Sequence, residues 1–447
     1  MEEMKVPTDP PDIPTLLSGL KPDRTAVVLE HLAAPTVQGR YFHWDELRRR
    51  KPPDDLTSEE WWLTLKLTRG LGRRQLPFND TSGRPFSYIL TDEVLSMLHR
   101  IDRLASGRIA VPEAITNEAT KDRYVVSSLM EEAIGSSLLE GAATTRNEAK
   151  ELLRSGRRPR TIAERMVVNN YVTMQHIRLD LDVPLATDMV IEIHRLVTED
   201  TLEDPNDAGR IQEPGETRVD VGDPMDPAII FHLPPPAKEL PHLLTGLTSF
   251  ANDVESEPFT HPVVRAVALH FYMSYIHPFI DGNGRTARAL FYRSMLRQGY
   301  WLAEFLSISR LLYQAPTQYA RSFLYTETDE GDFTYFLLHQ LTVISRAIDE
   351  LFAYLERKVG EVRRVEQAFR SVPGLNHRQL ALLSHAIRNS HTAYTFESHR
   401  HSHNIVYQTA RADLLDLEAL GFLERHQVGR QYHFYPATGL SQLILGD

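Results

Sequence analysis

The residues best suited to chemistry lie in one twelve-residue segment, HPFIDGNGRTAR, at positions 277–288. Its Gly-Asn-Gly sequence at 282–284 precedes a predicted helix, so successive backbone N–H groups and the positive end of that helix favour an anion. Arg285 and Arg288 add permanently charged, fork-shaped donors for phosphate oxygens. The segment therefore predicts a site that binds phosphate groups.

Two further residues of the segment suit a metal ligand and a base. Asp281 would be repelled by bare phosphate, but it is suited to hold Mg²⁺ between its carboxylate and phosphate oxygens. His277, with an ordinary pKa of about 6.5, can accept a proton from an attacking hydroxyl at neutral pH. Alone, a histidine before proline is usually packed, and Gly-Asn-Gly is usually a turn. The ordered combination indicates metal-assisted nucleotidyl or phosphoryl transfer.

Helical patterns flank this segment on both sides. Residues 261–275 are apolar on nearly every face, as expected for a helix at the centre of a bundle, and residues 286–296 resume a helical period. The segment is therefore predicted to be a loop that leads into the N-terminus of a buried helix. Residues 204–236 place Gly, Pro and Asp around short Val and Ile runs, which predicts a β-hairpin or an ordered loop.

The composition of the whole chain limits its class. It has 447 residues, no cysteine and a net charge of -11, which predicts two or three domains and excludes disulfides, thiol catalysis and cysteine-ligated zinc. The N-terminal sequence is acidic and proline-rich, unlike a signal peptide, and no run of about eighteen apolar residues occurs. We expect a cytoplasmic protein without a membrane span, whose net charge disfavours coating of nucleic acid.

We predict three regions. Residues 1–110 form a loosely held tail, rich in Pro and Asp, and then a small helical lead-in. Residues 111–365 form the domain that carries the motif. Residues 371–447, after a boundary at the sequence SVPG, show three helical segments and two β-rich runs, the order of a winged helix-turn-helix, with Val406–Leu420 as the recognition helix.

The charge of the C-terminal region does not decide what it binds. Residues 371–447 hold six arginines and six acidic residues, so DNA binding and a protein-docking or dimerising role are about equally favoured. His399, His401 and His403 alternate as in some metal sites, but without a clear acidic partner they are expected in a polar loop. The basic stretch Arg154–Arg160 is predicted to be a solvated loop.

The segment at 277–288 resembles the signature of Fic-domain enzymes, His-x-Phe-x-Asp/Glu-Gly-Asn-Gly-Arg-x-x-Arg, at every specified position. The similarity extends over about residues 40–365, including SSLLEG, TRNEAKELL, NNYVTM and the segment from AGRIQ to LPPPA. It implies a mainly α-helical Fic bundle with a short β-hairpin flap, which binds Mg²⁺ and ATP and transfers AMP to a hydroxyl side chain. Some relatives transfer phosphate or phosphocholine, but Asp281 and the intact GNGR sequence favour AMP.

The resemblance also implies roles for single residues. His277 would deprotonate the target hydroxyl, Asp281 would hold Mg²⁺, and Phe279 would lie in the core. The residues expected to bind ATP are Gly282, Asn283, Gly284, Arg285 and Arg288. The segment Val219–Pro236 resembles the flap that holds the extended backbone of the target, by strand addition.

A second sequence, SSLLEG, ends a predicted amphipathic helix near residues 121–141, where Gly141 would form the C-terminal cap. Ser136, Glu140 and Gly141 match the inhibitory pattern of the family, Ser/Thr-x-x-x-Glu-Gly/Asn. The resemblance implies that Glu140 pairs with Arg288 and removes the partner of the ATP γ-phosphate. It equally allows Glu140 to align a water that removes AMP from modified targets.

Two functions therefore stay open. The first is an autoinhibited AMP transferase acting on a target protein or on itself; the second is a DNA-binding transcriptional regulator whose Fic domain senses nucleotide. His277 favours the enzyme, because a sensor needs phosphate ligands but no base. The expected partners are ATP, a protein with a hydroxyl side chain and, through the C-terminal region, DNA or a second copy of the chain.

Overall fold

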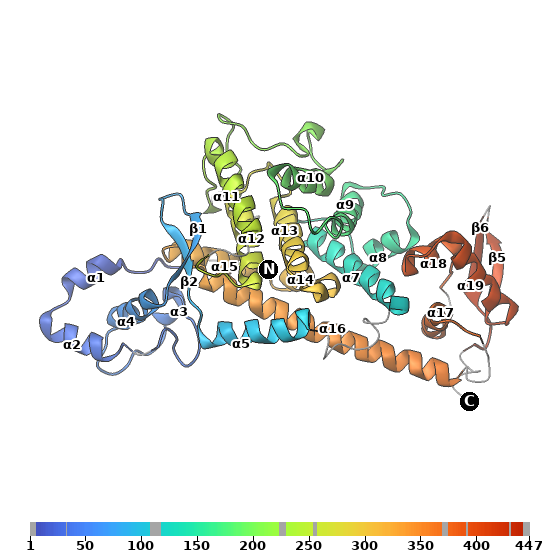
Figure 1. Ribbon diagram of the computed structural model, residues 1–447, viewed down its shortest axis with the longest axis horizontal. Helices are drawn as coiled ribbons and strands as arrows, with labels where there is room; N and C mark the ends of the chain where they lie inside the picture. The colour runs from blue at the N-terminus through green and yellow to red at the C-terminus, as the bar shows by residue number, and fades with distance from the viewer. Residues whose placement is uncertain are drawn as a thin grey trace. The chain divides into compact units, whose positions relative to one another are not determined.

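The computed structural model describes residues 6–32, 34–107, 118–222, 229–253, 257–368, 374–389, 392–428 and 431–440. This part of the chain is mainly helical, with three two-stranded antiparallel sheets (Figure 1). The predicted fold class, a helical protein with a short hairpin ahead of the motif, is confirmed. Within the described residues, no helix combines the length and apolar character needed to cross a bilayer.

The chain divides into two compact units. The first unit comprises Met1–Arg103, Val172–Trp301 and Leu311–Ser345, and the second comprises Leu104–Tyr171, Leu302–Arg310 and Arg346–Asp447. Several helical elements contain residues of both units: η1 (Asp102–Ser106), α9 (Ile162–His176), η4 (Trp301–Phe305), α14 (Ile308–Gln314) and α16 (Thr334–Ala368). The predicted region boundaries near residues 110 and 371 lie outside the described residues.

The core of the first unit is built around α12 (Pro262–Ile276), which buries almost all of its side chains, as its apolar sequence predicts. The helix starts at a proline that needs no N–H partner, and the His261 ring caps it by accepting the N–H of Val263. Its neighbours α11 (Leu240–Asn252) and α13 (Asn283–Arg297) pack against it. The other elements of this part of the unit are α10 (Thr187–Thr198), η2 (Pro205–Asp207), β3 (Val221–Gly222), β4 (Ile230–His232), η3 (Ala237–Glu239) and α15 (Pro316–Thr328).

The N-terminal part of the first unit is more ordered than the sequence predicts. Two helices form where a loose tail was expected, and Asp12 starts the first by accepting the N–H of Thr15 at 2.9 Å. A hairpin also interrupts the predicted helical lead-in, because the Asp80 carboxylate accepts the N–H groups of Ser82 and Arg84 and closes a turn. The elements are α1 (Ile13–Gly19), α2 (Pro22–Glu30), α3 (Trp44–Leu47), α4 (Ser58–Leu71), β1 (Arg74–Asn79), β2 (Pro85–Tyr88) and α5 (Asp92–Ile101).

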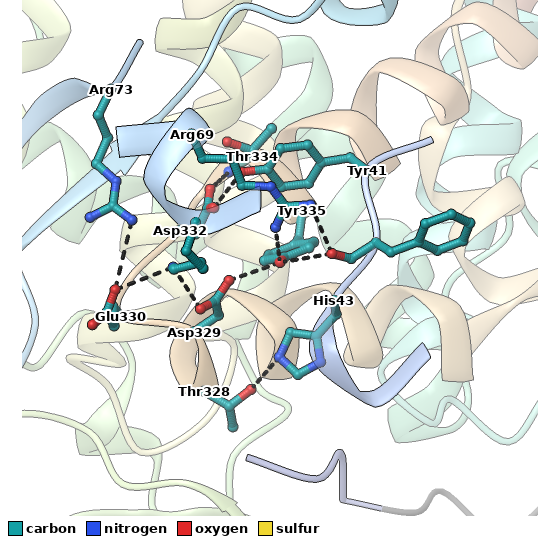
Figure 2. A network of polar contacts seen from close by, with 12 residues as sticks. Tyr41, His43, Arg69, Arg73, Thr328, Asp329, Glu330, Asp332, Thr334 and Tyr335 are labelled. Carbon is teal, nitrogen blue, oxygen red and sulfur yellow. Dashed lines mark hydrogen bonds and ion pairs between the residues drawn. The ribbon is translucent and has the colours of Figure 1, made fainter. Parts of the chain in front are cut away.

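A buried network of charged side chains joins α4 to the loop between α15 and α16 (Figure 2). Lys66 Nζ lies 2.7 Å from Asp329 Oδ1, and the other oxygen of Asp329 accepts the hydroxyl of Tyr335 at 2.8 Å. Arg69 donates to the same tyrosine oxygen at 3.0 Å. Burial alone would raise the pKa of Asp329, but the neighbouring cations, Lys66 above all, hold it below its usual value.

The same loop is fixed by two more residues ahead of α4. The Tyr41 hydroxyl donates to Asp332 at 2.5 Å, and His43 Nε2 lies 3.2 Å from the Thr328 hydroxyl (Figure 2). Burial lowers the pKa of His43 to about 4, so this histidine is neutral in the folded protein near pH 7. The network therefore anchors the N-terminal segment to the helices that follow the motif in sequence.

The second unit contains α7 (Glu118–Leu139), α8 (Arg146–Ser155), α17 (His377–Arg388), α18 (Phe396–His403), α19 (Tyr407–Ala419), β5 (Leu423–Val428) and β6 (Gln431–Pro436). The predicted order of three helices and a hairpin is present at its C-terminal end, and α19 is capped by Val406 and Leu420, the predicted limits of the recognition helix. The expected polar loop at the alternating histidines is wrong, since His399, His401 and His403 lie on α18. His399 is buried and contacts Asp413 at 3.0 Å, an acidic partner that is distant in sequence.

Candidate active site

The motif begins at a strained residue. His277 ends α12 with φ at +46°, a conformation that non-glycine residues adopt mainly in special positions. Its Nδ1 lies 3.2 Å from the carbonyl oxygen of Ser274. Because a carbonyl only accepts, Nδ1 carries the proton in the neutral ring, and Nε2 is the nitrogen able to take up another. The backbone thus presents His277 as a base of defined tautomer.

Arg218 holds the end of α12 in this conformation. Its guanidinium donates to the carbonyl oxygens of Ile276 and His277, each at 2.7 Å, and to that of Pro235 at 2.8 Å. The side chain is half-buried, and this burial lowers the pKa of Arg218. Sequence inspection missed this residue, because a single arginine in a loop gives no signal of the carbonyl groups that folding brings to it.

The hairpin expected between residues 204 and 236 is present, formed by β3 and β4. Residues 223–228 of the predicted flap lie outside the described residues. Val221 and Ile230 are exposed on the hairpin, whereas His232 is buried and bridges two other elements. Its Nε2 lies 2.7 Å from the carbonyl oxygen of Tyr275 on α12, and its Nδ1 lies 2.6 Å from Glu327 on α15. The hairpin is therefore tied to the helix that ends at His277.

Asn283 stabilises the loop with its side chain. Its Oδ1 accepts the N–H of Phe279 at 3.0 Å, and its Nδ2 donates to the carbonyl oxygen of Phe279 at 2.8 Å. Phe279 is fully buried, as predicted, and stacks on His194 with 3.6 Å between ring centroids. Both amide atoms of the Asn283 side chain are hydrogen-bonded to the backbone of Phe279. An anion at this position would therefore contact the backbone N–H of Asn283.

His194 of α10 fixes the next turn of the loop. Its Nδ1 accepts the N–H of Gly209 at 3.0 Å, so Nε2 carries the proton and donates to the carbonyl oxygen of Asp281 at 2.8 Å. Burial lowers the pKa of His194 to about 4, which keeps it neutral. The sequence analysis missed this residue, although its spacing from Val190 and Val197 places it on the buried face of α10.

Gly282 is required for this close approach. Its φ is +81°, and a Cβ there would lie 2.5 Å from Cγ2 of Thr198. The residue also forms the N-cap of α13, and in the described part of the chain no side chain caps the first N–H groups of this helix. Such an N-terminus, close in sequence to the predicted base, is suited to an anionic group.

The structure pairs two of the predicted ligands with each other. Asp281 Oδ2 accepts Nη2 of Arg285 at 2.9 Å, and the aspartate side chain is 55% exposed while the arginine side chain is fully buried. Arg285 also donates to the carbonyl oxygen of Val197 at 3.0 Å. From this position Arg285 supports Asp281 from beneath the loop, whereas Asp281 keeps an exposed carboxylate.

Arg288 lies almost one turn further along α13 and is buried. Burial of the His270 ring lowers the pKa of that histidine, and the positive charge of Arg288 lowers it further. The structure thus gathers in one unit all the predicted residues of the motif: His277, Asp281, Gly282, Asn283, Gly284, Arg285 and Arg288.

The other predicted residues, Ser136, Glu140 and Gly141, belong to the second unit. There Gly141 has φ at +83°, and its N–H donates to Leu138 while that of Ala142 donates to Ser137. This is the αL cap predicted for Gly141, and Glu140 directly follows Leu139, the last residue of α7. Pairing of Glu140 with Arg288 stays a prediction.

Known proteins share this arrangement in part. Residues 184–295 match the Fic/DOC family model, a region that includes the motif and α10 but not Glu140. A protein named protein adenylyltransferase Fic from Nematostella vectensis is 34% identical over 116 residues, which is 26% of this chain and 24% of that protein. Protein adenylyltransferase fic-1 from Caenorhabditis elegans is 35% identical over 118 residues, 26% of this chain and 20% of that protein.

The similarity of fold reaches further than the similarity of sequence. A Fic family protein from Desulfovibrio desulfuricans G20 aligns in structure with a TM-score of 0.51 and 18% identity, covering 79% of this chain and 98% of that one. At this identity the alignment shows the fold alone. The chain covers 24% and 20% of the length of these two curated relatives. Their names therefore describe those proteins and are not carried over to this chain. Residues 184–295, which hold the motif, therefore match the Fic/DOC family in sequence, and the chain shares its fold with a Fic family protein.

Proposed function

We propose that this chain is a protein adenylyltransferase, which moves AMP from ATP to a Ser, Thr or Tyr hydroxyl of a target protein or of itself. The observation that carries the proposal is His277, a base of defined tautomer held at positive φ shortly before the uncapped N-terminus of α13. Further support comes from relatives named protein adenylyltransferase, which are 34% identical over 116 residues and 35% identical over 118 residues.

In the proposed reaction, the target hydroxyl gives its proton to Nε2 of His277 while its oxygen attacks the α-phosphorus of ATP. A new oxygen–phosphorus bond forms, the bond from the α-phosphorus to the bridging oxygen breaks, and pyrophosphate leaves. The first N–H groups of α13 and the charge of Arg288 would stabilise the phosphate oxygens during this exchange. The hairpin of β3 and β4 would align the extended target backbone beside His277.

The residues present fit a magnesium ion. Asp281 offers an exposed carboxylate whose two oxygens each use one lone pair, on Gly282 and on Arg285, and retain others. Mg²⁺ commonly uses one or two carboxylates and completes its shell with phosphate oxygens and water. When bound, the ion would neutralise charge on the phosphates, and Arg285 would keep the Asp281 carboxylate in place.

We infer that Glu140 restrains this activity by pairing with Arg288. Support comes from the rigid placement of α7 within its own unit. The buried Glu132 accepts the backbone N–H and the hydroxyl of Ser309, and a Cβ on Gly135 would lie 2.6 Å from the backbone nitrogen of Arg310. These contacts and the cap at Gly141 define where Glu140 lies within the second unit.

The test is AMP transfer by purified wild type, Glu140→Gly, His277→Ala and the double variant. Each is incubated with Mg²⁺, α-labelled ATP and a lysate, and label on protein is measured. We expect label to rise in Glu140→Gly and to disappear when His277→Ala is added. If no variant transfers label while wild type still binds ATP, the adenylyltransferase proposal fails, and the nucleotide-sensing regulator becomes the better explanation.

Several expectations remain predictions beside this proposal. The removal of AMP by Glu140, DNA binding or self-association through the C-terminal helices, and a cytoplasmic location each need their own experiment. The exposed surface of α19, which includes Arg411, is the place to test for DNA.

A further inference from the structure

The second unit contains a cavity of about 270 Å³ with walls from α7, α8, α16, α17 and α18. Its size is close to the lower end of small-molecule sites. The end of α8 packs closely against α18, because a Cβ on Gly156, at φ +64°, would lie 2.5 Å from Nε2 of His401. No function considered so far uses this space.

The chemistry of the walls favours an anion. Lys150 and Arg154 line the cavity, and no acidic side chain does so within the described residues. Lys150 is paired with Glu131 at 2.9 Å, but that carboxylate also binds Arg146 at 2.7 Å, so one negative charge serves two cations. Arg154 has no ion-pair partner in the described part of the chain. Positive charge is therefore left over at this wall.

Other residues that line the cavity add neutral donors and a flat ring. The hydroxyls of Ser127 and Ser402 border the cavity, and so does the ring of Tyr354. Hydroxyl, guanidinium and ammonium donors together suit the several oxygens of a phosphate group, and Arg can bind two of them at once. A recess of this volume can hold a phosphate with a small attached group, such as a sugar, whereas a nucleic-acid duplex is far too large to enter it.

A second cavity of about 550 Å³ adjoins the first, since both are lined by Ser127, Lys150 and Tyr354. Its walls also carry Arg310 and Arg357, so the excess of cations continues beyond the shared lysine. Two carboxylates, those of Glu131 and Glu350, balance only part of this charge.

We propose that the cavity between α7, α8 and α18 binds a small phosphorylated metabolite, with Arg154 and Lys150 as the phosphate ligands. The site also touches the regulatory helix, because Ser127 and Met130 belong to α7 and Glu140 lies at the end of the same helix. A ligand that binds one arrangement of α7 and Glu140 better than another shifts the population toward that arrangement. This coupling, unlike the binding, rests on the proposed function.

Binding is tested on the full chain by calorimetry with pairs of probes that differ only in phosphate: ribose 5-phosphate against ribose, and AMP against adenosine, with inorganic phosphate in addition. We expect at least one phosphorylated probe to bind, and its unphosphorylated partner to bind at least about tenfold more weakly. Hydrogen exchange should show new protection at residues 125–131 and 394–403. DNA oligonucleotides, run in parallel, should give no protection there.

Three variants locate the site. Arg154→Gln should weaken binding at least about tenfold. Ser402→Leu, which fills the cavity from α18, should also weaken binding at least about tenfold. Arg158→Gln is the matched control, because this exposed arginine of the same basic stretch does not line the cavity. Arg288→Gln separates the cavity from the motif, and binding should survive it. Thermal melts confirm that each variant is folded.

The proposal is overturned if no phosphorylated probe binds at millimolar concentration, if binding survives both Arg154→Gln and Ser402→Leu, or if Arg288→Gln abolishes it. The coupling is read separately, from AMP transfer with and without the bound probe. The probe should change labelling by wild type and leave Glu140→Gly unaffected. Binding without any change in labelling would refute the coupling alone, and binding by a chain that never transfers AMP would refute only the proposed function.

Discussion

Two loops of the first unit gather charged residues between consecutive helices, and they do so in opposite ways. The loop between α15 and α16 buries Asp329 and Asp332 and pairs them with Lys66 and with the hydroxyl groups of tyrosines. The loop between α12 and α13 leaves Asp281 with a side chain that is 55% exposed, ahead of a helix whose first N–H groups have no side-chain cap.

The two loops show how a carboxylate that stabilises the fold differs from one that stays accessible to a ligand. A buried carboxylate is tolerated only when cations and donors satisfy it, and Asp329 and Asp332, which are 1% and 3% exposed, are used within the fold in this way. In the α12–α13 loop the neutral groups, Asn283 and His194, satisfy the backbone, while the exposed carboxylate and the helix N-terminus stay available. The Asp281 carboxylate itself is held by a buried cation, Arg285, so the two loops differ in whether the carboxylate is buried with its partner or kept at the surface.

The largest effect is expected from the base of the α12–α13 loop. His277→Ala should lower AMP transfer by about 10²–10⁴-fold, the usual contribution of a general base. His277→Gly should be equally inactive but at least as stable as wild type, because glycine adopts positive φ without strain. Labelling and a thermal melt of both variants check this. If His277→Gly retained labelling, the histidine would be only a capping residue.

The next largest effect is on stability and comes from the α15–α16 loop. Lys66→Met should cost about 3–5 kcal/mol of unfolding free energy, because it leaves Asp329 buried without its cation. Tryptophan fluorescence during urea unfolding reports it selectively, since all four tryptophans lie in the first unit.

Two controls test whether burial causes that loss. Lys66→Met combined with Asp329→Asn should regain part of the stability, because the amide carries no charge. Arg195→Gln, which breaks an exposed pair with Glu192, should cost less than about 1 kcal/mol. Equal costs for Lys66→Met and Arg195→Gln would mean that the buried network is no different from a surface ion pair.

A smaller loss is expected where the α12–α13 loop passes α10. Gly282→Ala should cost about 1–3 kcal/mol, from the strain of an alanine at positive φ and from overlap with Cγ2 of Thr198. Thr198→Ser removes that methyl group and keeps the hydroxyl, which donates to the carbonyl oxygen of His194. The double variant should therefore be more stable than Gly282→Ala alone. Absence of this rescue in urea unfolding would exclude the overlap as a cause.

The last expected effect depends on pH and is absent near neutral pH. Near pH 4 the unfolded chain protonates His194, whose ordinary pKa is about 6.5, whereas burial lowers the folded pKa to about 4. The contribution of His194 to the free energy of unfolding is thus complete above pH 6.5. It declines by up to about 1.4 kcal/mol per pH unit as the pH falls toward 4. His194→Gln, which retains a donor and an acceptor, should give a flatter stability profile in this range. An unchanged profile would show that His194 does not titrate there.

The sequence predicted the chemistry of the motif because those residues lie together in twelve positions, and local spacing sets the turn and the helix start. It also predicted the cap at Gly141, because glycine is the residue that most readily adopts the positive φ of such a cap. It missed His194 and Arg218, whose roles depend on carbonyl groups from other elements. It placed His399 in a loop because its partner, Asp413, is fourteen residues away on another helix.

The sequence alone therefore predicted the helical class, which the structure confirms, and a set of residues suited to bind phosphate and accept a proton, since periodicity and adjacent side chains are local properties. Only the tertiary structure decided that Arg285 supports Asp281 from below, that neutral histidine and asparagine hold the loop, and that cations border a recess beside α7. Those outcomes depend on burial and on contacts between distant segments, which fix whether a charge is neutralised inside the protein or left available at a site.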